Sequence, residues 1–139
     1  MTITEGRQAL AAMISGATGV TYSPAALPSL ISVKQLPAAI VRYRRLTNAV
    51  IGTGSVYEQG VSYRVQVAVS LLNVETAEAE LETATDGIIA ALRADPTIGG
   101  VAEDMVAGVT TEPAIYDENA SGTPLLVGTI DVTLTTEER

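Results

Sequence analysis

The side chains that could do chemistry in this sequence are mostly carboxylates and arginines, because it contains neither histidine nor cysteine. The commonest general base, the commonest transition-metal ligand and the thiolates of a zinc site are therefore missing. A Ser-His-Asp triad and a zinc-hydrolase site are excluded. Carboxylates, lysine and tyrosine can still catalyse reactions. The absence of histidine and cysteine, and of the sites that need them, nevertheless favours a protein that is not an enzyme and has no catalytic residue, metal or cofactor.

Three stretches look like ligand sites by composition, and each has a simpler interpretation. The glycine-rich residues 51–55 lack the Gly-Lys-Ser/Thr ending of a phosphate-binding loop, and a strand is predicted after them instead of a helix. The acidic residues 117–119 lack the spacing of a calcium loop. The carboxylates of residues 75–86 have no histidine partner of the kind found in a di-iron bundle. We interpret these three stretches, in the same order, as a turn, a solvent-exposed loop and the solvent-exposed face of a helix.

Arg42, Arg44 and Arg45 form the densest basic group of a chain with 8 basic and 16 acidic residues and a net charge of −8. The overall charge predicts repulsion from nucleic acid. For the three arginines two interpretations stay open: an exposed strand face, or a contact with the acidic surface of another subunit.

The elements that would position these charges are organised around residues 61–100. Apolar side chains alternate along residues 61–71, which is typical of a strand with one covered face. Residues 74–94 then carry apolar side chains at three- and four-residue spacing with glutamates on the remaining surface, which predicts a long amphipathic helix. Asp95-Pro96 ends that helix, because the residue before a proline is disfavoured in the helical region.

The flanking segments predict the rest of the fold. A capping box of Thr2 and Glu5 begins a helix over residues 2–15, and a strand starts just after Pro37. Residues 48–60 indicate a hairpin or an extended loop, and residues 17–36 a connection with one short strand at residues 30–33.

Beyond the long helix, residues 101–116 indicate one or two strands interrupted at Gly108, and residues 125–135 indicate a last strand. We therefore predict a single α+β domain over residues 1–139. Its mixed, mostly antiparallel sheet is packed by the long helix and the N-terminal helix.

Four segments of this pattern resemble the tail terminator proteins of long-tailed bacteriophages, which complete the tail and join it to the head. They are residues 36–41 (LPAAIV), 63–67 (YRVQV), 88–100 (IIAALRADPTIGG) and 128–134 (GTIDVTL). The resemblance covers most of the chain from Leu36 onward, and the N-terminal helix agrees in position. Residues 17–35 match no part of the family pattern.

The resemblance implies a structural virion protein with an α+β fold. It would form a ring, usually of six subunits, that caps the completed tail tube, stops its growth and meets the head connector, while DNA passes through the lumen without specific binding. A head-to-tail ring needs two complementary patches on each subunit. The expected interface joins Arg42, Arg44 and Arg45 of one subunit to Glu78 and Glu82 on the helix of its neighbour.

Two other functions remain as alternatives. One is a different neck component of the same particle, such as a head-closure, connector or minor tail protein. The other is a small-molecule-binding regulatory domain in which residues 52–60 shape a pocket. The sequence has no apolar run of about 20 residues and no signal-peptide order at its N-terminus, so we expect a soluble protein made in the host cytoplasm and carried in the virion neck.

Overall fold

Both helices begin and end where local sequence signals place them. In α1 (Ile3–Ser15), the Thr2 hydroxyl accepts a hydrogen bond from the Glu5 backbone N–H at 3.1 Å, and the Glu5 carboxylate accepts one from the Thr2 N–H at 2.9 Å. This reciprocal pair is the predicted capping box. Gly16 closes α1, and α2 (Val74–Ala94) ends immediately before Asp95-Pro96. The predicted helix bounds are confirmed.

The four strands form one sheet in the order β1-β2-β4-β3, with every neighbouring pair antiparallel. The computed structural model describes residues 1–24, 35–50, 57–71, 74–102, 104–116 and 125–138. Within them lie β1 (Ala38–Val50), β2 (Tyr57–Ser70), β3 (Asp104–Tyr116) and β4 (Leu125–Glu138). A bridge between Tyr22 and Ala38 adds a parallel pairing at the start of β1. The α+β prediction is confirmed.

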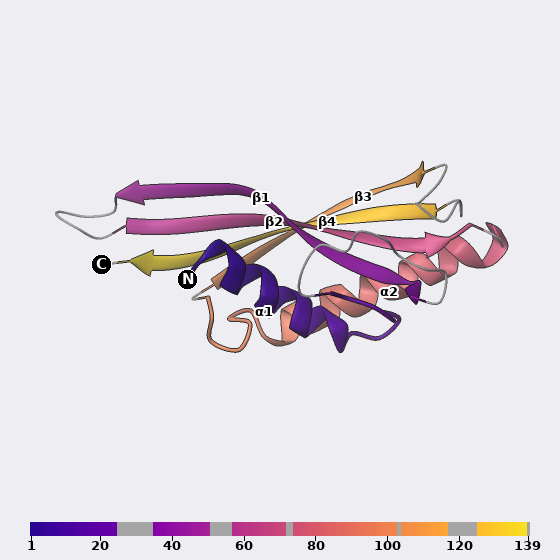
Figure 1. Ribbon diagram of the computed structural model, residues 1–139, viewed down its shortest axis with the longest axis horizontal. Helices are drawn as coiled ribbons and strands as arrows, with labels where there is room; N and C mark the ends of the chain where they lie inside the picture. The colour runs from indigo at the N-terminus through magenta and orange to yellow at the C-terminus, as the bar shows by residue number, and fades with distance from the viewer. Residues whose placement is uncertain (25–34, 51–56, 72–73, 103, 117–124, 139) are drawn as a thin grey trace.

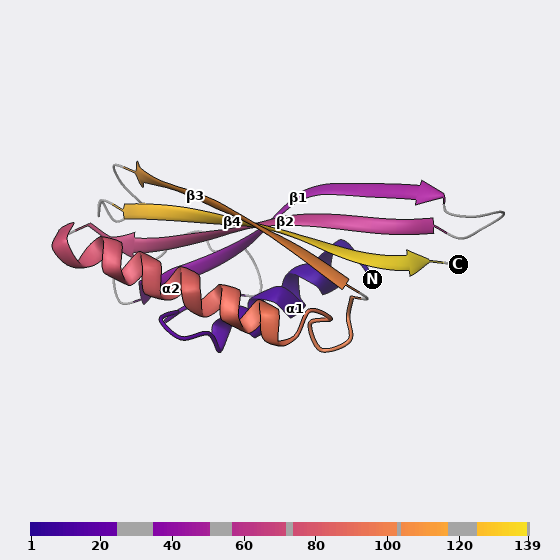
Figure 2. The same ribbon diagram turned by 180° about the vertical axis from the view of Figure 1, so that it is seen from behind.

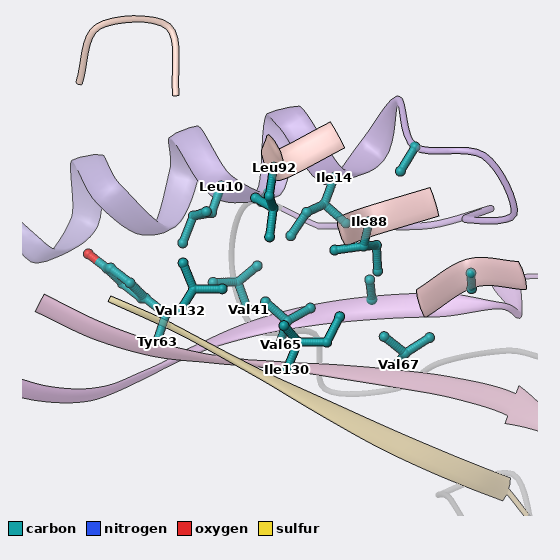
Figure 3. Packing of buried hydrophobic residues seen from close by; sticks show 14 of the residues in the cluster. Leu10, Ile14, Val41, Tyr63, Val65, Val67, Ile88, Leu92, Ile130 and Val132 are labelled. Atoms are coloured by element: carbon teal, nitrogen blue, oxygen red, sulfur yellow. The ribbon is translucent and has the colours of Figure 1, made fainter. Parts of the chain in front are cut away.

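Both helices cover the same face of the sheet, as the two views in Figures 1 and 2 show. α1 packs mainly on β1, while α2 packs on β2 and β4. The covered face is built from the predicted alternation, so that Val65 lies between Val41 and Ile130 across the ladders. Helix side chains point into this face from above in Figure 3. They include Leu10, Ile14, Ile88 and Leu92.

The strands are longer than predicted, and one interruption is absent. β1 and β2 extend toward each other as the two arms of a hairpin, and β4 continues to Glu138. β3 runs through Gly108 as a single strand, and its irregularity lies between Thr110 and Ala114 instead. Backbone pairing with β4 holds Gly108 in the ladder, so the expected break there is wrong. The predicted strand at residues 30–33, the turn at 51–55 and the acidic loop at 117–119 lie outside the described residues.

The turn after α2 shows why the Asp-Pro-Thr-Ile-Gly-Gly segment has this composition. The Asp95 carboxylate accepts hydrogen bonds from the Thr97 hydroxyl at 2.9 Å and from the Gly99 N–H at 2.8 Å. Ile98 is buried although its φ is +48°, a region that β-branched residues rarely adopt. Gly99 and Gly100 also have positive φ, at 69° and 87°. The turn therefore holds an apolar anchor in the core at the expense of local backbone strain.

Candidate interaction surface

The three predicted arginines lie on the face of the sheet that the helices do not cover. Arg42 pairs in register with Arg64, and Arg45 pairs with Ser62, which belong to the outer face of β2. Arg44 reaches Asp131 on the outer face of β4, with 3.4 Å between its Nη1 and the carboxylate Oδ2. All three arginines are exposed. The structure thus gathers them on one surface, which we call the arginine patch together with Arg64.

A β-bulge is what brings Arg45 to the same face as Arg44. The β1–β2 register shifts between Tyr43 and Arg45, so Arg44 is the extra residue of β1. Strict alternation would have placed Arg45 on the helix-covered face together with Tyr43. A bulge shifts the strand by one residue and lets two consecutive side chains share a face. The next residue, Leu46, then returns to the covered side opposite Val61.

Arg64 and Asp131 are residues of the patch that the sequence interpretation did not assign. They are direct partners across the β2–β4 ladder, and the Arg64 Nε donates to the Asp131 Oδ1 at 3.0 Å. Asp131 therefore contacts two arginines from two strands. The sequence does contain one signal that could have identified them: both residues occupy outward-facing positions in segments of alternating apolar and polar residues. Only the pairing of β2 with β4, which joins residues 67 positions apart, shows that they meet.

The arginine patch holds half of the eight basic residues of an acidic chain. Next to it, the hydroxyls of Ser62 and Thr133 lie 3.0 Å apart and share a hydrogen bond. Two of its four guanidinium groups, those of Arg44 and Arg64, pair with the Asp131 carboxylate, which leaves an excess of positive charge on the patch. Planar guanidinium groups bind carboxylates and phosphates through paired hydrogen bonds, so exposed acidic side chains are one kind of ligand that fits such a surface.

Glu78 and Glu82 lie on the opposite side of the molecule from the arginine patch. Both are exposed on α2, whose Ala77, Leu81 and Ala84 are buried toward the sheet. The structure therefore does not bring the two predicted sets together within one chain. They occupy two separate surfaces of opposite charge, which is the arrangement that a head-to-tail contact between copies requires.

No protein-family model matches this chain, and no curated protein matches it.

Other kinds of site find little support in the described part of the chain. Its acidic residues form no group of three or more that could hold a metal ion. None of its helices has the length and apolar character needed to cross a bilayer. The loop expected to shape a pocket falls largely on residues 51–56, which lie outside the described residues.

An open groove of about 670 Å³ lies elsewhere, along the first half of α2. One wall consists of Thr76, Ala79 and Thr83, and Val20, Leu36 and Pro37 belong to the other. The side chains along α2 are small, and Glu80 adds a carboxylate to the lining. We call this feature the α2 groove.

Two groups have pKa values displaced by their surroundings, the buried phenol of Tyr63 and the partly exposed carboxyl of Asp95. Burial raises the pKa of the Tyr63 phenol from 10.0 to about 12, although the nearby Arg7 charge opposes the change. The Tyr63 hydroxyl donates to the Ile3 carbonyl at 2.6 Å, which ties the start of α1 to β2. Hydrogen bonds from the Gly99 N–H and then from the Thr97 hydroxyl lower the pKa of Asp95. Tyr63 and Asp95 hold parts of the fold together through these hydrogen bonds, and both lie outside the arginine patch.

Proposed function

We propose that this chain is a structural, non-enzymatic protein of the tail-terminator kind, which assembles into a ring of copies, usually six. The ring caps the completed tail tube of a long-tailed phage and joins it to the head connector in the virion neck. The observation that carries the proposal is the placement of the arginine patch and the glutamate face of α2 on opposite sides of one subunit.

Two different complementary patches make a heterologous interface, and a heterologous interface closes into a ring when the rotation between copies permits it. In this arrangement Arg42, Arg44 and Arg45 of one copy face Glu78 and Glu82 of the next. Complementary charges steer the copies together and reject wrong orientations more than they add affinity. The contact is therefore expected to set the order of subunits in the ring.

The same arrangement accounts for how DNA would pass. The arginines would otherwise attract phosphate, but a neighbour's glutamates cover them in the ring. The remaining surface belongs to a chain with a net charge of −8, which repels the DNA backbone. No residue of the lumen needs to recognise a base.

The proposal is tested by measuring the mass of the assembly. Native mass spectrometry or light scattering should give a ring-sized oligomer, either for the protein alone or after addition of polymerised tail-tube protein. Electron microscopy should then show the ring at one end of each tube. A protein that binds the head connector but never the tube would indicate the alternative neck component. A chain that stays monomeric with both partners would overturn the proposal, and a monomer that binds a metabolite would favour the small-molecule alternative.

A further inference from the structure

The uncovered face of the sheet is laid out in rows of side chains that run across the strands. The register places the arginine patch and the polar groups beside it in three neighbouring rows: Arg45–Ser62–Thr133, Arg42–Arg64–Asp131 and Gln66–Thr129. Neighbouring strands are about 4.8 Å apart, and successive outward residues of one strand are about 7 Å apart. The patch therefore presents closely spaced cations with hydroxyl and amide groups at its rim.

Asp131 neutralises part of the positive charge of the patch. Its carboxylate is shared by Arg44 and Arg64, at 3.4 and 3.0 Å. Arg42 lies directly opposite Arg64, and like charges in this position are unfavourable across a ladder. Four arginines against this one aspartate leave three positive charges in excess among the patch residues. An anion bound here relieves the repulsion between Arg42 and Arg64, so the patch attracts an oxyanion more strongly than an isolated arginine does.

The net charge of −8 does not decide what binds to this face, because charges act over a short distance in salt. The Debye length is about 8–10 Å at physiological ionic strength. Glu78 and Glu82 are exposed on α2, so the sheet and the helix layer lie between them and the patch. Besides Asp131, the acidic side chain described on this face of β1, β2 and β4 is Glu58, about 20 Å along β2 from Arg64. The patch is therefore a local positive field on an acidic molecule.

The residue types of the rows suit the backbone of a nucleic-acid duplex. Proteins hold duplex phosphates with arginine, serine, threonine and glutamine side chains, all of which occur here. Single strands are bound largely by stacking their bases on aromatic rings. The sequence has no Phe or Trp, and Tyr43 pairs with the buried Tyr63 on the helix-covered side. The described side chains of the uncovered face thus offer contacts for phosphate and no ring for a base.

We propose that the arginine patch of the free subunit binds the phosphate backbone of duplex DNA without reading its sequence. In the ring the same arginines face the neighbour's glutamates, so DNA binding and ring closure exclude each other. This exclusion rests on the proposed function, whereas binding by the free subunit does not. Linkage requires DNA to weaken assembly by the same factor by which assembly weakens DNA binding. A closed ring has therefore lost the surface that would hold DNA.

Fluorescence anisotropy of a labelled duplex of about 30 base pairs measures the binding. The full chain with Glu78→Gln and Glu82→Gln supplies free subunits, because the proposed ring contact is missing, and sedimentation velocity checks that it is monomeric. It should bind the duplex at about 50 mM salt. The affinity should fall with a log–log slope of about −3 as salt is added, because three excess charges release about 0.9 counterion each.

Substitutions in this parent identify the residues that bind. Arg42→Gln and Arg45→Gln should each make the salt slope shallower by about 1. Asp131→Asn should raise the affinity and make the slope steeper by about 1, because it removes the carboxylate of the patch. Arg93→Gln is the matched control, since it neutralises an exposed arginine at the end of α2, and it should bind as the parent does.

The unaltered chain tests the exclusion. The duplex should lower its ring fraction in sedimentation velocity, and the isolated ring should bind the duplex about tenfold more weakly than free subunits do. A ring that binds as tightly as free subunits would overturn the exclusion.

Two results would overturn the DNA site and leave the proposed function standing. One is binding of poly-glutamate by the free subunit without binding of the duplex, which would make the patch selective for carboxylates. The other is duplex binding that Arg42→Gln with Arg45→Gln does not weaken. A chain that binds the duplex through the patch but forms no ring, even with tail tubes, would instead remove the proposed function and support the DNA site.

Discussion

Arg64 and Asp131 face each other across the β2–β4 ladder, with 3.0 Å between the guanidinium Nε and the carboxylate Oδ1. Asp131 also receives Arg44 from β1, so a single carboxylate holds arginines from two strands. This arrangement holds two side chains of the arginine patch in place on the sheet face that the helices do not cover. It also shows that the patch is a property of the sheet and not of the Arg42–Arg45 segment alone.

Asp131→Asn should change the stability of the fold very little. The ion pairs are partly exposed to solvent, and pairs of this kind contribute about 0–1 kcal/mol. We expect the free energy of unfolding, measured with urea, to fall by less than about 1 kcal/mol. The positive charge of the patch rises at the same time, so association with an acidic partner should become more sensitive to salt. A loss of several kcal/mol would mean that Asp131 has a structural role beyond these pairs.

Charge reversal at Arg42 and Arg44 should weaken ring assembly while leaving the fold intact. Because Arg44 also contacts Asp131, Arg42→Glu with Arg45→Glu is the cleaner pair. Truncated or reversed charges at a close interface cost about 2–5 kcal/mol, which corresponds to a loss of at least tenfold in the association constant. Sedimentation velocity measures the ring fraction, and far-UV circular dichroism the fold.

Arg93→Glu serves as the matched control, because it reverses an exposed arginine at the end of α2 and away from the sheet face. It should assemble like the unaltered chain. Adding Glu78→Arg and Glu82→Arg to the Arg42→Glu, Arg45→Glu variant should restore part of the ring fraction. If the arginine reversals leave assembly unchanged, the patch is not the interface.

The stability contribution of Tyr63 should disappear at high pH. Burial raises its pKa from 10.0 to about 12, so below pH 10 the phenol is protonated in both states and the contribution is complete. Between pH 10 and pH 12 mainly the unfolded chain releases the proton, and the free energy of unfolding falls by up to about 3 kcal/mol. Tyr63→Phe should remove this part of the pH dependence. It should also cost about 1 kcal/mol at pH 7, because the hydrogen bond to the Ile3 carbonyl is lost.

Comparing urea unfolding of the unaltered chain and Tyr63→Phe at pH 8 and pH 11 isolates this effect from the other titrating groups. The difference between the two proteins should shrink as the pH rises. An equal difference at both values would show that the phenol ionises alike in both states.

Asp95 should contribute stability that is lost in acid. Its pKa in the folded chain is below the ordinary 3.8, because the Gly99 N–H and the Thr97 hydroxyl donate to the carboxylate. The contribution is therefore complete above the unfolded value and disappears as the pH falls through the lower folded value. An NMR titration of the Asp95 carboxyl should give a midpoint below 3.8, and Asp95→Asn should flatten the acid limb of the stability curve. A midpoint at or above the ordinary value would contradict the turn geometry.

Gly87→Ala should destabilise the fold although alanine favours helices. A side chain at this position would overlap the backbone carbonyl oxygen of Thr18, which cannot rotate away. Overpacking costs about 1–3 kcal/mol, whereas the helix preference of alanine over glycine is worth about 1 kcal/mol. The overlap involves backbone, so we expect the loss to dominate and thermal unfolding to occur at a lower temperature. Gly16→Ala is the control, since its nearest contact would be an ordinary 3.7 Å.

Local sequence signals determined most of the secondary structure. The Thr2–Glu5 capping box begins α1, Pro96 ends α2, and Pro37 precedes β1, because each acts through backbone groups within a few residues. The period-2 alternation of β2 and β4 determined which faces would be buried. The class of the fold follows from these elements, since a one-sided sheet and two one-sided helices must cover each other.

Only the tertiary structure decided what the charged residues form together. Alternation alone would have turned Arg45 inward, and the bulge in β1 keeps it beside Arg44. Strand pairing joined Arg64 to Asp131, and helix packing on one face separated Glu78 and Glu82 from the arginines. Periodicity fixes the direction of a side chain relative to its own strand or helix. Register, bulges and the choice of covered face depend on contacts between residues distant in sequence, which a local pattern does not contain.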